Sequence, residues 1–229
     1  MKTEILNLNT SRGATTAFVA RPDTEANAAV ILIQEWWGIN DHIRDIAGRW
    51  AKEGYLCVAP DLYRGRLAKD ADEASKLMHA LAIKDGMETI RKAIEAAGAT
   101  YEIQRFGITG YCMGGTFALR AACEIPALAA SAPFYGDIPE DDVLKKLTVP
   151  TLFIAGDRDG WITPEKVDGL KAAARKYDLP VEVLSYDADH AFFNDTRPEV
   201  YNAGAAADAW QRVLSLFRKH LLQTAARTA

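Results

Sequence analysis

The stretch from Arg105 to Gly115, Arg105-Phe106-Gly107-Ile108-Thr109-Gly110-Tyr111-Cys112-Met113-Gly114-Gly115, predicts a β-strand that turns directly into an α-helix. The run Arg105–Gly110 is typical of a strand, and the small residues of Met113–Cys123 are typical of a closely packed helix. Between them, Gly110-x-Cys112-x-Gly114 has the spacing of a nucleophile elbow, with cysteine in the place of serine. Glycines are needed beside such a turn because a Cβ atom would clash there.

The elbow makes Cys112 a candidate nucleophile. The turn places the sulfur above the sheet, and the helix N-terminus favours negative charge and hence a thiolate. Backbone N–H groups at the turn can also stabilise an oxyanion. A glycine-rich turn of this kind can instead bind a dinucleotide, but glycine would then be needed at position 112. An inert buried cysteine on a tight turn is the other alternative.

Outside the elbow, strand-like runs alternate with helical patterns, and we find no repeat, low-complexity tract or flexible linker. Residues Glu4–Asn9 and Thr15–Ala20 flank a turn signal around Gly13 and predict an N-terminal β-hairpin. The other strand-like runs are Ala28–Gln34, Tyr55–Ala59, Leu128–Phe134, Thr151–Ala155 and Val181–Tyr186, and the other helical patterns cover Asp41–Lys52, Asp72–Ala97 and Ala206–Leu221. We therefore predict one α/β domain over residues 1–229, with a mostly parallel central sheet and helices on both faces.

The composition argues against several classes of protein. With 27 Lys and Arg against 31 Asp and Glu, the net charge is -4, which is not typical of a protein that binds nucleic acid or an anionic membrane. The longest apolar run, Ala28–Ile33, is too short to cross a bilayer, and the first residues do not resemble a signal segment. Three cysteines without metal-type spacing are typical of a reducing compartment, so we expect a cytoplasmic protein.

The candidate base is His190. In parallel sheets ligands bind beyond the carboxyl ends of the strands, and His190 follows the strand-like run Val181–Tyr186 in a loop. The remaining histidines, His42, His79 and His220, lie in helical patterns, where we expect solvated or helix-terminal side chains. A loop histidine without a function is the alternative for His190.

The candidate acid is Asp159, three residues past Gly156 at the end of another strand-like run. It would accept the Nδ1–H of His190 and so fix the tautomer and the orientation of the ring. Asp157 is the alternative acid, although an aspartate at this place can also simply form a turn. The order Cys112, Asp159, His190 along the chain is the order found in α/β hydrolases, so we predict that fold.

A fourth candidate segment is Gln34-Glu35-Trp36-Trp37-Gly38, at the end of the run Ala28–Ile33. The N–H of Trp36 would be the second oxyanion donor beside that of Met113. A Glu35 carboxylate near Cys112 would raise the pKa of the thiol or act as a base towards it. The alternative is a solvated acid, with the two tryptophans in the core. Aromatic residues beside the strand ends predict an apolar pocket, although each could equally belong to the core: Trp36, Trp37, Tyr135, Trp161, Phe192 and Phe193.

Together these segments resemble the dienelactone hydrolase (carboxymethylenebutenolidase) family of α/β hydrolases. The residues that carry the resemblance are Gln34-Glu35-x-x-Gly38-Ile39-Asn40, Ala59-Pro60-Asp61-Leu62-Tyr63, Gly107-x-x-Gly110-Tyr111-Cys112-Met113-Gly114-Gly115 and His190-Ala191-Phe192. The resemblance implies a triad of Cys112, His190 and Asp159, and an oxyanion hole formed by the amides of Trp36 and Met113. It also implies that Glu35 helps to form the thiolate when substrate arrives. The implied reaction is formation of an acyl-thioester from a lactone or ester, followed by attack of water.

The chain departs from this family where the carboxylate of dienelactone would bind. Family members that open dienelactone hold that carboxylate with two arginines, one in the helix after the Pro-Asp-Leu-Tyr segment and one four residues past the histidine. Here the stretch Ala71–Ala82 contains no arginine, and Asn194 stands four residues past His190. Arg64, Arg66 or Arg197 could replace them, or could be exposed loop residues. We therefore expect a small lactone or ester as substrate, preferably cyclic or aromatic, and leave its charge open.

Other interpretations stay open. The chain could be a carboxylesterase for neutral esters or a homologue that binds a ligand without turnover. A redox sensor based on Cys112 is disfavoured, because Cys57 lies in a predicted strand and Cys123 in a predicted helix. A metal site at Asp187, Asp189, His190 and Asp195 fits no common ligand set. We predict no metal, no cofactor, no nucleic-acid or membrane partner, and a monomer or weak homo-oligomer.

Overall fold

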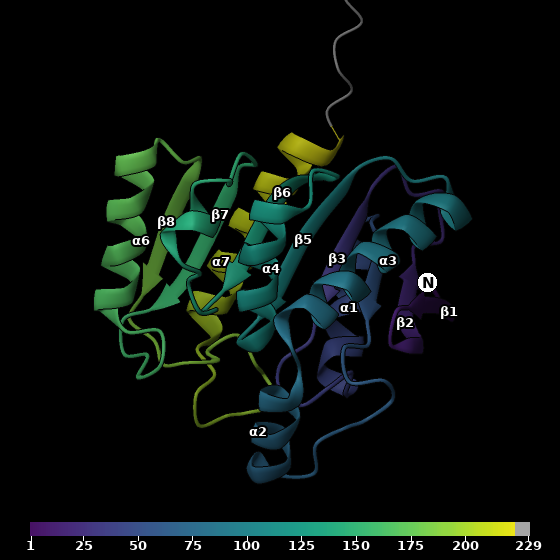
Figure 1. Cartoon of the computed structure of the whole chain (residues 1–229), viewed down its shortest axis with the longest axis horizontal. Coiled ribbons are helices and arrows are strands. Elements are labelled where there is room, and N and C mark those ends of the chain that lie inside the picture. Colours follow the sequence, from purple (N-terminus) through teal and green to yellow (C-terminus); the bar gives the residue numbers. More distant parts are fainter. Residues whose placement is uncertain (223–229) are drawn as a thin grey trace, which may run out of the picture.

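One eight-stranded sheet runs through residues 1–222, the part of the chain that this computed structural model describes (Figure 1). Residues 223–229, the end of the predicted domain, lie outside that part. In spatial order the strands are β1 (Lys2–Thr10), β2 (Gly13–Arg21), β4 (Leu56–Pro60), β3 (Ala29–Ile33), β5 (Phe106–Tyr111), β6 (Leu128–Phe134), β7 (Thr151–Gly156) and β8 (Val181–Tyr186). Strands β3 to β8 are parallel, while β1 and β2 form an antiparallel hairpin at one edge. The predicted sheet and hairpin are confirmed.

Helices cover both faces of the sheet. They are α1 (Asp41–Lys52), α2 (Ala71–Ala80), α3 (Ile83–Tyr101), α4 (Met113–Glu124), α5 (Asp141–Leu144), α6 (Pro164–Tyr177) and α7 (Ala203–Phe217), which continues into a π-helical turn, Arg218–Leu222. Helices α1 and α7 pack together on one face, where the ring of Trp50 lies 4.5 Å from Trp210 and 5.3 Å from Phe217, measured between centroids. Helices α3, α4 and α6 cover the other face.

The central strands are buried along their full length. Every residue of β3, β4 and β5 is buried, as expected for parallel strands covered on both faces. Helix α1 begins where Asn40 accepts a hydrogen bond from the N–H of Ile43 at 3.1 Å, a standard N-cap. The carboxyl ends of the parallel strands therefore meet at one edge of a rigid sheet, and loops from β3, β5, β7 and β8 can place side chains side by side there.

The helices differ from the prediction in two ways. The pattern over Asp72–Ala97 is divided between α2 and α3, because Leu81 and Ala82 have extended backbones with ψ of 103° and 138°. Neither residue is a glycine or proline, so the local sequence does not signal the break. Helices α5 and α6 are additional to the predicted helices. Helix α2 buries only Ala74 and Leu77 and lies beyond the carboxyl ends of the strands (Figure 1).

No helix within residues 1–222 is both long and apolar enough to cross a bilayer.

Candidate active site

Cys112 stands on a strained turn between β5 and α4. Its backbone has φ 57° and ψ -121°, a left-handed conformation that costs on the order of 1–3 kcal/mol for a residue with a side chain. The turn requires glycine on both sides. A Cβ atom at Gly110 would lie 2.3 Å from the carbonyl oxygen of Gly114, and one at Gly114 would lie 2.3 Å from that of Ile33. The elbow predicted from the sequence is therefore present, and close packing explains its glycines.

His190 and Asp159 form a hydrogen-bonded pair at the ends of two neighbouring strands. Nδ1 of His190 lies 2.6 Å from Oδ2 of Asp159. Because an ionised carboxylate can only accept, Nδ1 carries the proton and donates a hydrogen bond to Asp159. Oδ1 of Asp159 accepts the N–H groups of Trp161 at 2.7 Å and Ile162 at 2.9 Å. Burial raises the pKa of Asp159, but the hydrogen bond and charge of His190 outweigh it, and the pKa lies below its usual value.

The imidazole ring is held between aromatic side chains. Trp161 meets it edge-on at 5.3 Å between centroids, and Tyr135 does so at 5.0 Å. Nε2 of His190 is buried and has no hydrogen-bond partner within residues 1–222. The ring therefore has a fixed orientation, and its second nitrogen is free to exchange protons with a bound molecule.

Cys112 and His190 open into the same cavity, of about 300 Å³. Its wall is mostly apolar, with one carboxyl and one guanidinium group, and it is formed by Glu35, Trp36, Trp37, Met78, Cys112, Trp161, His190, Ala191 and Arg197. A cavity of this size and composition suits a small organic ligand.

The surroundings of the Cys112 sulfur favour the neutral thiol. Burial raises its pKa, and the nearby Glu35 carboxyl raises it further, while hydrogen bonds from the N–H groups of Met113 and Trp36 lower it. The thiolate stabilisation expected from the helix N-terminus is therefore outweighed by desolvation. These hydrogen bonds also show that the N–H groups of Trp36 and Met113, the two predicted oxyanion donors, lie next to the sulfur.

Glu35 is a buried acid, only 2% exposed, and not a solvated residue at a strand end. Burial raises its pKa to about 7. A hydrogen bond from Asn194, together with the charges of His190 and Arg197, lowers the pKa and opposes this effect. At neutral pH the carboxyl is therefore close to half protonated and can take up or release a proton.

The structure divides the predicted substrate-binding residues into two groups. Trp37 and Trp161 line the cavity. Tyr135, Phe192 and Asn194 are buried and do not line it. Tyr135 and Phe192 instead pack against each other below the histidine, with ring centroids 5.5 Å apart.

Arg64 and Arg66 lie outside the cavity that Cys112 and His190 share. Arg64 turns back to the β1–β2 hairpin and donates to the carbonyl oxygens of Gly13 at 3.1 Å and Ala14 at 3.0 Å. Arg66 approaches Glu73 at 3.9 Å, and neither arginine lines the cavity. Arg197, the third arginine considered, does line it. Proximity in the sequence could not separate the three, because the position of Arg64 depends on contacts with the distant β1–β2 hairpin.

Met78 lines the cavity although no pattern in the sequence singles it out. It reaches the site from α2, whose position depends on tertiary packing, so no local signal could have identified it.

His42 lies in the first turn of α1, as expected for a helix-terminal residue, but its side chain is 4% exposed and not solvated. Its Nδ1 lies 3.4 Å from Oδ1 of Asp195. Burial lowers its pKa, with a smaller opposing effect from Asp195. It therefore packs beneath the loop that follows His190.

The acidic side chains considered for a metal site have other partners. Asp187 and Asp189 both pair with Arg158, and Asp195 pairs with Arg49. No group of three or more potential metal ligands occurs within residues 1–222.

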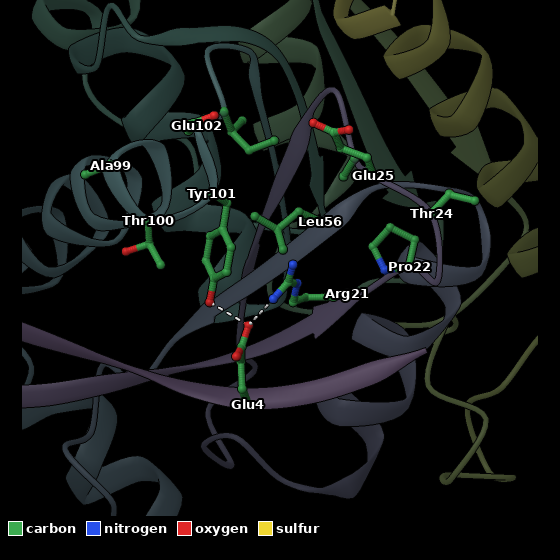
Figure 2. A pocket seen from close by; sticks show the side chains of 12 residues that line it. Glu4, Arg21, Pro22, Thr24, Glu25, Leu56, Ala99, Thr100, Tyr101 and Glu102 are labelled. Carbon is green, nitrogen blue, oxygen red and sulfur yellow. Dashed lines mark hydrogen bonds and ion pairs between the residues drawn. The ribbon is translucent and has the colours of Figure 1, made fainter.

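A larger pocket, of about 480 Å³, lies at the amino ends of the strands (Figure 2). Glu4 lies there between Arg21, at 3.3 Å, and the hydroxyl of Tyr101, at 2.9 Å. None of the predicted site residues lines this pocket, and these polar groups bind one another.

Comparison with known proteins agrees with this geometry. The sequence model of the dienelactone hydrolase family matches residues 15–221. A protein from Yersinia pestis, whose name assigns it provisionally as a carboxymethylenebutenolidase, is 35% identical over 226 residues that cover 89% of this chain and 83% of that one. A protein of the same provisional name from Aquifex aeolicus is 32% identical over 217 residues, which cover 89% of this chain and 93% of that one.

A solved structure gives the same result. A protein from Klebsiella pneumoniae, described provisionally as a dienelactone hydrolase, superposes with a TM-score of 0.88 at 29% identity, covering 96% of this chain and 99% of that one. Sequence and structure agree over nearly the whole chain, with the elbow and the His190–Asp159 pair at the predicted strand ends. The chain belongs to the dienelactone hydrolase family of α/β hydrolases.

Proposed function

We propose that the protein hydrolyses a small ester or lactone through an acyl-thioester on Cys112. The observation that carries this proposal is the shared cavity of Cys112 and His190, in which Nε2 of the histidine is unpartnered and Nδ1 is bound to Asp159. The names of the relatives, which refer to opening of a lactone, support the same class of reaction.

The first half of the reaction forms the thioester. Glu35 takes the proton of the Cys112 thiol, and the sulfur attacks the carbonyl carbon of the substrate. The carbonyl oxygen becomes negative and accepts hydrogen bonds from the N–H groups of Trp36 and Met113. The carbon–oxygen bond then breaks, and the leaving oxygen receives the proton held by Glu35.

The second half releases the acid. Nε2 of His190 takes a proton from water, and the resulting hydroxide attacks the thioester carbonyl. Asp159 stabilises the imidazolium that forms. The carbon–sulfur bond breaks, and the imidazolium returns its proton to the Cys112 sulfur, which restores the resting thiol.

The buried surroundings of the sulfur fit this sequence of proton transfers. The reactive form pairs a neutral thiol with an ionised Glu35 carboxylate, and a pKa of about 7 leaves part of the carboxyl in that form at neutral pH. The amides of Trp36 and Met113 favour the negative charge only when it develops.

The cavity wall favours a flat, mostly apolar substrate. Trp37, Met78 and Trp161 present apolar surface, and the volume of about 300 Å³ limits the substrate to a small molecule. A cyclic or aromatic ester satisfies both conditions. Arg197 is the one cation of the described residues that lines the cavity, so an anionic lactone is the second candidate.

The direct test compares hydrolysis of a neutral aryl ester by the wild type and by Cys112→Ala. We expect turnover by the wild type and none above the uncatalysed rate by the variant. Hydrolysis at the wild-type rate by Cys112→Ala would exclude the proposed nucleophile.

A further inference from the structure

We propose that Asn194 is a positioning residue that holds the Glu35 carboxyl toward Cys112 and ties this base to the loop that carries His190. The inference rests on the proposed function, in which Glu35 accepts the thiol proton. It gives Asn194 a part in the reaction although this residue does not line the cavity.

The contact between the two side chains is short and buried. Nδ2 of Asn194 donates to Oε2 of Glu35 at 2.8 Å, and the residues are 1% and 2% exposed. Within residues 1–222, no other side chain is hydrogen bonded to this carboxyl. Asn194 therefore determines how the carboxyl is turned.

The orientation of the Asn194 amide is fixed by its other end. Oδ1 of Asn194 accepts two hydrogen bonds from Thr196, one from the backbone N–H at 3.1 Å and one from the hydroxyl at 2.6 Å. Both acceptor sites of the amide oxygen are thus used, so the NH2 group must face Glu35. A flipped amide would set an acceptor oxygen against the carboxyl and leave the Thr196 donors unpaired.

The loop around Asn194 is anchored on both sides. The N–H of Asn194 donates to the carbonyl oxygen of Ala191 at 2.9 Å, one residue past His190. The next residue, Asp195, pairs with Arg49 and lies 3.4 Å from Nδ1 of His42, both of which belong to α1. The loop therefore sets His190 and Glu35 in a fixed relation, because it carries one and holds the other.

The hydrogen-bond partner of Glu35, the Asn194 amide, carries no charge, and this affects how readily Glu35 accepts a proton. A neutral amide stabilises a carboxylate less than a cation would, so Glu35 remains basic enough to accept a proton. The ionisable groups that face Glu35 are Cys112, His190, Arg197, Tyr111 and Tyr135.

The test follows the titration of Glu35 itself. Carbon-13 NMR of the glutamate side-chain carboxyls gives its pKa in the full-length protein, with the signal assigned by its loss in Glu35→Gln. Asn194→Leu keeps the branched shape of the side chain and removes the donor, so we expect the pKa of Glu35 to rise by roughly one unit. The rate of Cys112 alkylation by iodoacetamide also depends on pH, and the acid limb of this pH–rate profile should move to higher pH by the same amount. Thr196→Val, which leaves the amide in place, should give a smaller rise in the same direction.

Asn202→Leu is the matched control. Asn202 caps α7 by accepting the N–H of Ala205 at 3.1 Å and has no contact with Glu35, so its loss should lower Tm without moving the Glu35 titration. An unchanged pKa of Glu35 in both Asn194→Leu and Thr196→Val would overturn the inference, whatever happens to Tm. The titration needs no substrate, so its result does not depend on whether the proposed function is correct. Failure of the proposed function would instead appear as wild-type turnover by Cys112→Ala.

Discussion

The carboxylate of Asp159 lies 2.6 Å from Nδ1 of His190 and also accepts two backbone N–H groups. With three donors, the carboxylate has a fixed position and remains ionised. The histidine is thereby held with its proton on Nδ1, and Nε2 is buried without a hydrogen-bond partner among residues 1–222.

Asp159→Asn should therefore lower kcat by about a thousandfold, since an amide can donate to Nδ1 and hold the wrong tautomer. Asp157→Asn is the control, because Asp157 is exposed on the same turn. Steady-state kinetics on an aryl ester checks both variants. A large loss in Asp157→Asn together with near wild-type activity in Asp159→Asn would reverse the assignment.

Cys112→Ser should retain little activity. A serine hydroxyl is far less acidic than a thiol, and Glu35, with a pKa of about 7, is too weak a base to deprotonate it. We expect kcat/KM to fall by at least a hundredfold with the fold intact by circular dichroism. Cys123→Ala changes a buried cysteine outside the cavity and should leave kcat unchanged. Wild-type activity in Cys112→Ser would show that the site is not tuned to sulfur.

Arg197→Gln should separate the two candidate substrates. If the physiological ester carries a carboxylate, the variant should raise KM for an anionic lactone about tenfold or more and leave KM for a neutral aryl ester of equal size unchanged. Arg64→Gln, outside the cavity, should change neither. An equal rise in KM for both substrates would indicate that Arg197 affects the ionisation of Glu35 and does not bind the carboxylate of the substrate.

Stability should fall as Glu35 ionises. Its pKa in the folded protein is raised to about 7 from an ordinary 4.5, so the folded state binds the proton more tightly and loses stability as pH rises from about 4.5 to 7. The shift corresponds to a loss on the order of 3 kcal/mol. Urea unfolding should therefore find Glu35→Gln more stable than the wild type at pH 8, with a smaller difference at pH 5. Glu25→Gln, at an exposed position, should show no such difference, and equal stability of Glu35→Gln and the wild type at pH 8 would contradict the account.

Local sequence signals were sufficient for the sheet and for the central site. Buried strands such as β3 and β5 are continuous apolar or small-residue runs, and the glycines around Cys112 report a packing requirement that any sequence with this turn must meet. The loops of His190 and Asp159 follow their strands directly. Their proximity in the structure therefore follows from the parallel order of the strands.

What could not be predicted depends on contacts distant in the sequence. The break at Leu81 has no glycine or proline to mark it. Met78 reaches the cavity from α2, and Arg64 is drawn to the β1–β2 hairpin, through contacts that no local pattern reports. Helix α6 begins with Pro164, a usual start signal that the predicted pattern of helices left out. The burial of His42 depends on the loop around Asp195, more than 150 residues away in the chain.

Mass spectrometry of a variant that cannot release the acyl group shows most directly whether Cys112 forms an acyl-thioester. In His190→Ala the first half of the reaction can still use Glu35, whereas activation of water is lost. After brief exposure to an aryl ester and acid quenching, we expect a mass increase equal to the acyl group, located on the peptide that contains Cys112. An unmodified protein, or an acyl group on another residue while the wild type turns over the same ester, would exclude Cys112 as the nucleophile.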